Sequence, residues 1–160
     1  LPESGYGWLM TLNAGMVVLF QFMVTRRVSD RPPMVVMALG SLLYVIGFGM
    51  YGFVSLYGLF MAAMAVITLG EMVMVPMAQS YVGDTAPEDM RGRYMGVMGF
   101  SWMIPWMIGP LLAGWIMDYG DPRWIWYGCA LLGSLAVIGF LWLDAVARRR
   151  AVYQAAPGVE

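Results

Sequence analysis

Long apolar runs separated by short polar breaks dominate the pattern of this chain. Five runs reach the ~20 apolar residues that an α-helix needs to cross a bilayer. They lie at about 6–25, 33–54, 57–82, 93–117 and 124–144. The breaks hold turn and helix-start signals, among them Asp121-Pro122 and Thr85 to Glu88, and the latter predicts a short surface helix. The pattern predicts an all-α integral membrane protein with five transmembrane helices over residues 1–150 and a tail over 151–160.

Composition supports a membrane location. Apolar residues make up 61% and charged residues 12% of the chain, against about 25% charged residues in soluble domains, and the mean hydropathy is +0.69. There is no His and only one Cys, Cys129, which excludes disulfide frameworks, Cys/His zinc sites and imidazole catalysis. We therefore expect neither an enzyme nor a metal or cofactor site. The net charge of -1 gives no sign of a nucleic-acid partner.

Basic residues are distributed unevenly between the two ends of the predicted helices. All nine are arginines, and eight of them follow the first, third and fifth runs. Because cytoplasmic loops are enriched in Lys and Arg, we place these loops and the C-terminus in the cytoplasm and the start of the chain outside. The expected location is a bacterial inner membrane.

Glu71 lies inside the third apolar run with no basic residue in that run to offset its charge. It falls on a helical stripe with Met64, Ile67, Met74 and Ala78. An ionisable residue in a membrane helix is costly and is by default a functional candidate. Glu71 is thus a candidate proton carrier, and Met74 a candidate cavity residue. The alternative is a hydrogen-bonded glutamate that ties two helices together.

Two amides interrupt the first run, Asn13 near its middle and Gln21 further along. A lone amide in hydrocarbon needs a partner or a water-filled cavity. Asn13 is a substrate-cavity candidate, with helix–helix hydrogen bonding as the alternative, which we favour for Gln21.

The fourth run combines small residues, prolines and tryptophans. Its helix-bend elements are Pro105, Gly109, Pro110 and Gly114. We expect a bent helix that approaches its neighbours closely and lines a cavity. Trp102 and Trp106 share a face and are candidates for an aromatic wall of that cavity, or for simple packing.

Charged residues of the loops form a further candidate group. Asp30 and Arg31 lie in the first loop, and Asp84, Arg91 and Arg93 in the third. Opposite charges on adjoining loops could pair and hold one conformation closed, although exposed pairs contribute only about 0–1 kcal/mol each. The plain alternative is orientation of the helices and contact with lipid headgroups.

Three segments carry a resemblance to a known family. They are Arg26-Arg27-Val28-Ser29-Asp30-Arg31, the loop from Gly83-Asp84-Thr85-Ala86-Pro87 to Arg91-Gly92-Arg93-Tyr94-Met95-Gly96, and Gly109-Pro110-Leu111-Leu112-Ala113-Gly114. Together they resemble the C-terminal half of a major facilitator superfamily transporter, its last five helices, nearest the proton-driven drug-efflux branch.

The resemblance implies a part of a twelve-helix bundle whose two six-helix halves enclose a site that opens alternately to each side. The first, third and fourth runs would line this site. Implied partners are the bilayer, the missing N-terminal half, a small-molecule substrate and protons as candidate coupling ion.

We therefore expect a fragment of a secondary active transporter that exports small amphipathic compounds. The first alternative is transport of sugars, nucleosides or siderophores by the same fold. An alternative of another class is a non-transporting five-span scaffold protein. The absence of an initiator Met at Leu1 agrees with a fragment.

Overall fold

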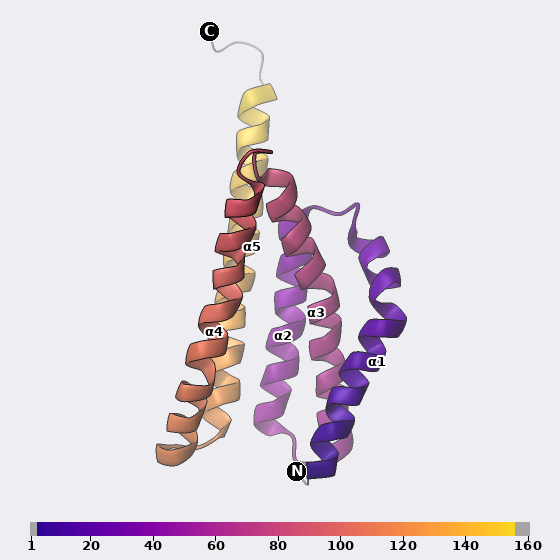
Figure 1. Ribbon diagram of the computed structural model, residues 1–160, viewed down its shortest axis with the longest axis vertical. Helices are drawn as coiled ribbons and strands as arrows, with labels where there is room; N and C mark the ends of the chain where they lie inside the picture. The colour runs from indigo at the N-terminus through magenta and orange to yellow at the C-terminus, as the bar shows by residue number, and fades with distance from the viewer. Residues whose placement is uncertain (1–2, 156–160) are drawn as a thin grey trace.

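The computed structural model describes residues 3–155 and contains five long α-helices that run up and down side by side (Figure 1). Their bounds are α1 Glu3–Val28, α2 Pro33–Phe53, α3 Tyr57–Thr85, α4 Arg91–Tyr119 and α5 Arg123–Ala155. All five are long and apolar enough to cross a membrane. The shortest, α2, has 21 residues and is about 31 Å long at 1.5 Å per residue. The predicted all-α class and the five helices are confirmed.

The helix ends differ from prediction at two places. α5 continues to Ala155 instead of stopping at 144, so part of the expected tail is helical, while residues 156–160 lie outside the described residues. An ion pair between Arg148 Nε and Asp144 Oδ2, 2.7 Å apart and one turn apart in sequence, supports this extension. The surface helix predicted after Thr85 is wrong: the loop is a turn in which the Met90 amide donates to the Pro87 carbonyl at 2.9 Å.

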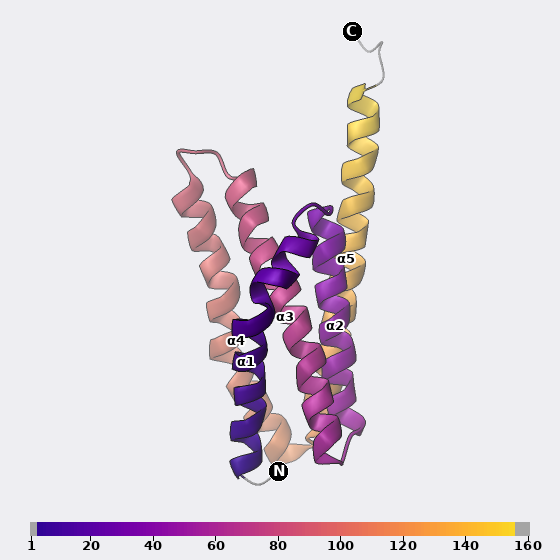
Figure 2. The ribbon, with the colours of Figure 1, turned by 90° about the vertical axis from the view of Figure 1, so that its right-hand side faces the viewer.

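α2 is the centre of the bundle. It packs along α3 and along α5, α1 packs on α3, and α4 touches α3 and α5 at only a few positions. Most of the fully buried apolar side chains belong to α2 and α3, including Val36, Met37, Met72 and Val73. Figure 2 shows α3 and α4 diverging from α2 and α5 toward one end of the bundle. We call it the arginine-rich end, since α1 finishes there at Arg26 and Arg27 and α4 begins there at Arg91.

Glycines allow α2 and α3 to approach closely. A Cβ atom at Gly70 would lie 2.9 Å from the Gly40 carbonyl oxygen, and one at Gly40 would lie 2.8 Å from the Met74 Cβ. Such mutual contact is typical of small residues at membrane helix interfaces. The closest helix–helix approach therefore lies between α2 and α3.

The expectation for the glycines of α4 is wrong in this structure. A Cβ added at Gly96, Gly99, Gly109 or Gly114 meets no atom within 4 Å, because α4 has few neighbours and buries none of its side chains. α4 remains one helix through Pro105 and Pro110. The predicted bend and hinge at these residues stay predictions.

Candidate functional site

Asn13 and Glu71 meet where α1 crosses α3, near the middle of both helices (Figure 2). The Asn13 Nδ2 atom donates to Glu71 Oε2 at 3.0 Å and to Thr68 Oγ1 at 3.0 Å. Both hydrogens of the amide nitrogen are therefore used. Asn13 and Glu71 are half-buried, whereas Thr68 is fully buried. Two candidates from different helices, separated by 58 positions in sequence, thus form one polar cluster.

Thr68 fixes the direction of hydrogen bonding in this cluster. Its hydroxyl donates to the Met64 carbonyl at 2.8 Å, one turn back in α3. Its oxygen is therefore the acceptor toward Asn13. Sequence reasoning overlooked Thr68, although a hydroxyl three positions before Glu71 lies on the same side of a helix. Spacing alone was the signal that could have identified it.

Gln21 compensates for a proline in α3. Pro76 lies inside α3 and has no N–H, so the Met72 carbonyl lacks its usual donor four residues ahead. Gln21 Nε2 donates to that carbonyl at 3.1 Å and to Thr25 Oγ1 at 2.9 Å. An unsatisfied carbonyl in a membrane is costly. The helix–helix interpretation of Gln21 is thus the one that the structure supports.

A polar cavity extends from Glu71 between α1 and α3. Its volume is about 390 Å³, and four of its seven lining residues are polar. It is lined by Val17, Gln21, Thr25, Glu71, Val75, Pro76 and Gln79. From Glu71, the lining residues of both helices continue toward the arginine-rich end. The carboxyl group therefore lies at the inner limit of a cavity that extends toward one side of the membrane.

Other cavity candidates lie elsewhere. Met74 Sδ accepts a hydrogen bond from Ser41 Oγ at 3.7 Å, and Met74 therefore faces α2. Three residues advance a helix by ~300°, which turns Met74 away from the side that carries Glu71, Val75 and Gln79. Trp102 and Trp106 are 46% and 78% exposed on α4 and do not line the cavity. The structure thus brings Asn13 and Glu71 together, but not these three side chains.

Charged loop residues gather at the arginine-rich end without pairing. Within the part of the chain that the structure describes, the only ion pair is Arg148 with Asp144. Asp84 accepts a hydrogen bond from Ser80 at 3.2 Å, and Asp30 from Ser29 at 3.4 Å. The expected pairs of Asp30, Asp84 or their neighbours with Arg31, Arg91 or Arg93 are absent from this conformation. A loop gate remains a prediction.

Comparison with known proteins gives a consistent picture. Residues 1–157 match the Major Facilitator Superfamily. A Na(+), Li(+), K(+)/H(+) antiporter of Planococcus maritimus is 29% identical over 157 residues, 94% of this chain and 35% of that protein. The multidrug efflux pump SdrM of Staphylococcus aureus is 27% identical over 103 residues, 64% of this chain and 23% of that protein. The chain spans about a third of the antiporter's length or less of these relatives.

A shorter match joins them. The multidrug transporter protein MdtP of Bacillus subtilis is 34% identical over 70 residues, 44% of this chain and 13% of that protein. No solved structure matches the chain significantly. The family match covers almost every residue and agrees with five helices of membrane-spanning length. The chain therefore belongs to the Major Facilitator Superfamily, a family of membrane transporters.

Proposed function

We propose that this chain is part of the C-terminal half of a proton-coupled transporter of the bacterial inner membrane, in which Glu71 carries the proton. The supporting observation is the position of the Glu71 carboxyl group. It is held by Asn13 at the middle of two membrane helices and lies at the inner limit of a polar cavity. The start of the chain lies outside and the arginine-rich end in the cytoplasm, as expected from the arginines.

The cluster suits reversible protonation. A carboxylate accepts a hydrogen bond at either oxygen, and a protonated carboxyl still accepts at one of them. The Asn13 amide can therefore donate to Glu71 in both states, and the helix contact survives loss or gain of the proton. The other oxygen of Glu71 is left to exchange a proton with water in the cavity. Burial disfavours the charged form, so a charged substrate or a second solvent exposure can displace the equilibrium.

We propose export of small amphipathic compounds as the transported function. Two of the relatives are a multidrug efflux pump and a multidrug transporter. The missing N-terminal half would complete the site and supply the alternating access. The bilayer, protons and a small-molecule substrate are then the partners of the whole protein.

A second candidate function is exchange of alkali cations for protons. The cavity beside Glu71 is lined by two amides and a hydroxyl rather than by aromatic rings. Oxygen-rich sites suit hard cations, and the relative from Planococcus maritimus is named a cation/proton antiporter. The same carboxyl group would then bind the cation and the proton in turn.

Glu71→Gln in the full-length protein tests the role of this carboxyl group. In inverted membrane vesicles with an imposed pH gradient, we expect loss of substrate-driven proton release while substrate binding is retained. The control is Asp118→Asn, which neutralises an exposed carboxylate on α4 and should leave coupling intact. Proton release at the normal rate in the Glu71→Gln protein would contradict the proposal.

The two substrate classes are separated in the same vesicles. Addition of Na⁺, Li⁺ or K⁺ should collapse the pH gradient if the protein exchanges cations. Addition of a lipophilic cationic dye should do so if it exports amphipathic compounds. The class that produces proton release through wild-type protein, and none through Glu71→Gln, identifies the substrate.

A further inference from the structure

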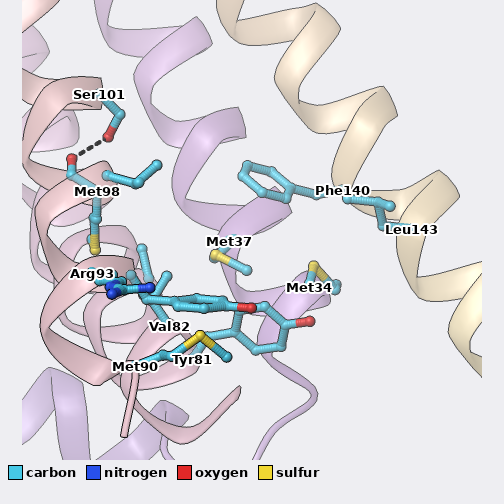
Figure 3. Close-up of a pocket in the computed structure, with 13 residues that line it drawn as sticks. Met34, Met37, Tyr81, Val82, Met90, Arg93, Met98, Ser101, Phe140 and Leu143 are labelled. Atoms are coloured by element: carbon cyan, nitrogen blue, oxygen red, sulfur yellow. Dashed lines mark hydrogen bonds between the residues drawn. The ribbon is translucent and has the colours of Figure 1, made fainter. Parts of the chain in front are cut away.

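A second, apolar groove lies on the other side of the bundle from the polar cavity. Its volume is about 620 Å³, and residues of α2, α3, α4 and α5 line it. Figure 3 shows Met34, Met37, Phe140 and Leu143 facing Met98 and Val82 across it. We call it the α4/α5 groove. Nothing proposed above for Glu71 uses this space.

The groove opens sideways between two helices. α2 packs along α3 and along α5, whereas α4 and α5 touch at only a few positions. α2 and α3 therefore form the floor, and α4 and α5 the separated walls. Val97 on the α4 wall is 71% exposed. An apolar space that opens between two membrane helices is accessible to lipid.

The length of the groove matches one leaflet. Along α4 its lining begins at Met90 and ends at Ser101, 11 positions on. This stretch of helix rises about 16 Å at 1.5 Å per residue, close to half of the ~30 Å hydrocarbon core. The groove thus has the depth of the acyl chains in the leaflet at the arginine-rich end.

A cationic side chain lies at the mouth of the groove. The Arg93 guanidinium projects from α4 into the space beside Val82 and Met90 (Figure 3). Among the described residues it has no ion-pair partner. The Tyr81 and Tyr94 side chains lie at the same level, as tyrosines do at the headgroup region of a bilayer. Apolar walls below a guanidinium group complement an acyl chain below a phosphate.

We propose that the α4/α5 groove binds an anionic phospholipid of the cytoplasmic leaflet. One acyl chain lies between α4 and α5 along Val97, Met98 and Phe140. The phosphate accepts hydrogen bonds from Arg93, whose planar guanidinium suits phosphate oxygens. The lipid fills the space between α4 and the rest of the bundle.

The first test measures lipid binding to the full-length protein by native mass spectrometry, with phosphatidylglycerol and phosphatidylcholine of identical acyl chains. Phosphatidylglycerol should bind more tightly, and Arg93→Gln should weaken it about tenfold by loss of a charge-assisted hydrogen bond. Arg93→Lys should restore part of the affinity. The control is Arg149→Gln, which removes an exposed charge of α5 outside the groove and should change nothing. Equal binding of both lipids, or equal losses in the two arginine variants, would overturn the proposal.

The second test identifies what occupies the groove. A nitroxide label at Val97, introduced as the only cysteine of the full-length protein, should be accessible to oxygen, which partitions into lipid, and protected from an aqueous nickel chelate. Protection from both reagents would show that another part of the protein covers the groove. Access to nickel would show that water fills it. Either result would overturn lipid binding at this place.

Discussion

The two flanks of α3 are built on opposite principles. Toward α2, glycines bring the backbones together, and a Cβ at Gly70 would lie 2.9 Å from the Gly40 carbonyl oxygen. Toward α1, hydrogen bonds of Asn13 and Gln21 make the contact, beside a cavity of about 390 Å³. Dry packing of this kind has one close fit, whereas a hydrogen-bonded contact beside water can exchange partners. The comparison indicates a rigid α2–α3 pair against which α1 is able to move.

The largest effect is expected from Gly70→Ala, because the new methyl group would press on backbone atoms of α2. Overpacking of this kind costs about 1–3 kcal/mol, which would lower the melting temperature of the full-length protein in detergent. The matched control is Gly99→Ala on α4, where a Cβ has open space and helix propensity favours Ala. Equal melting temperatures of the two variants would contradict the rigid packing of α2 on α3.

A smaller effect is expected at the proline of α3. Gln21→Leu should lower stability, because the Met72 carbonyl then loses its replacement donor. In a Pro76→Ala background the backbone N–H returns, and the same substitution should cost less. The difference between the two costs, measured by a double-mutant cycle of unfolding, should be about 0.6–1.7 kcal/mol. Additive effects would show that Gln21 and Pro76 act independently.

The smallest effect is expected from Thr68→Val, which removes the hydroxyl and keeps the branched shape. Asn13 retains its bond to Glu71, so the α1 contact should weaken by about 1 kcal/mol. Proton release in vesicles should continue at a reduced rate. Thr11→Val is the control, since the Thr11 hydroxyl bonds only its own helix at the Gly7 carbonyl. Complete loss of coupling in Thr68→Val would mean that the hydroxyl, rather than Asn13, positions the carboxyl group.

Hydropathy predicted much of the fold because lipid imposes length and backbone pairing on every spanning helix. It also placed Asn13 and Glu71 at similar depth, which the bond between them confirms. The faces of each helix were harder to predict, since every side of a membrane helix is apolar. Met74 was therefore assigned to a cavity although it contacts α2. The α4 glycines were assigned to close packing although they face open space.

The partner of the Met72 carbonyl has a further consequence, for the biogenesis of the protein. α3 carries two groups that are expensive in lipid: the Glu71 side chain, about 2.5–3.5 kcal/mol when charged at the centre of a helix, and the carbonyl left free by Pro76. Both find donors on α1, and α1 leaves the ribosome before α3. The order of the helices in the gene thus makes both partners available when α3 enters the bilayer.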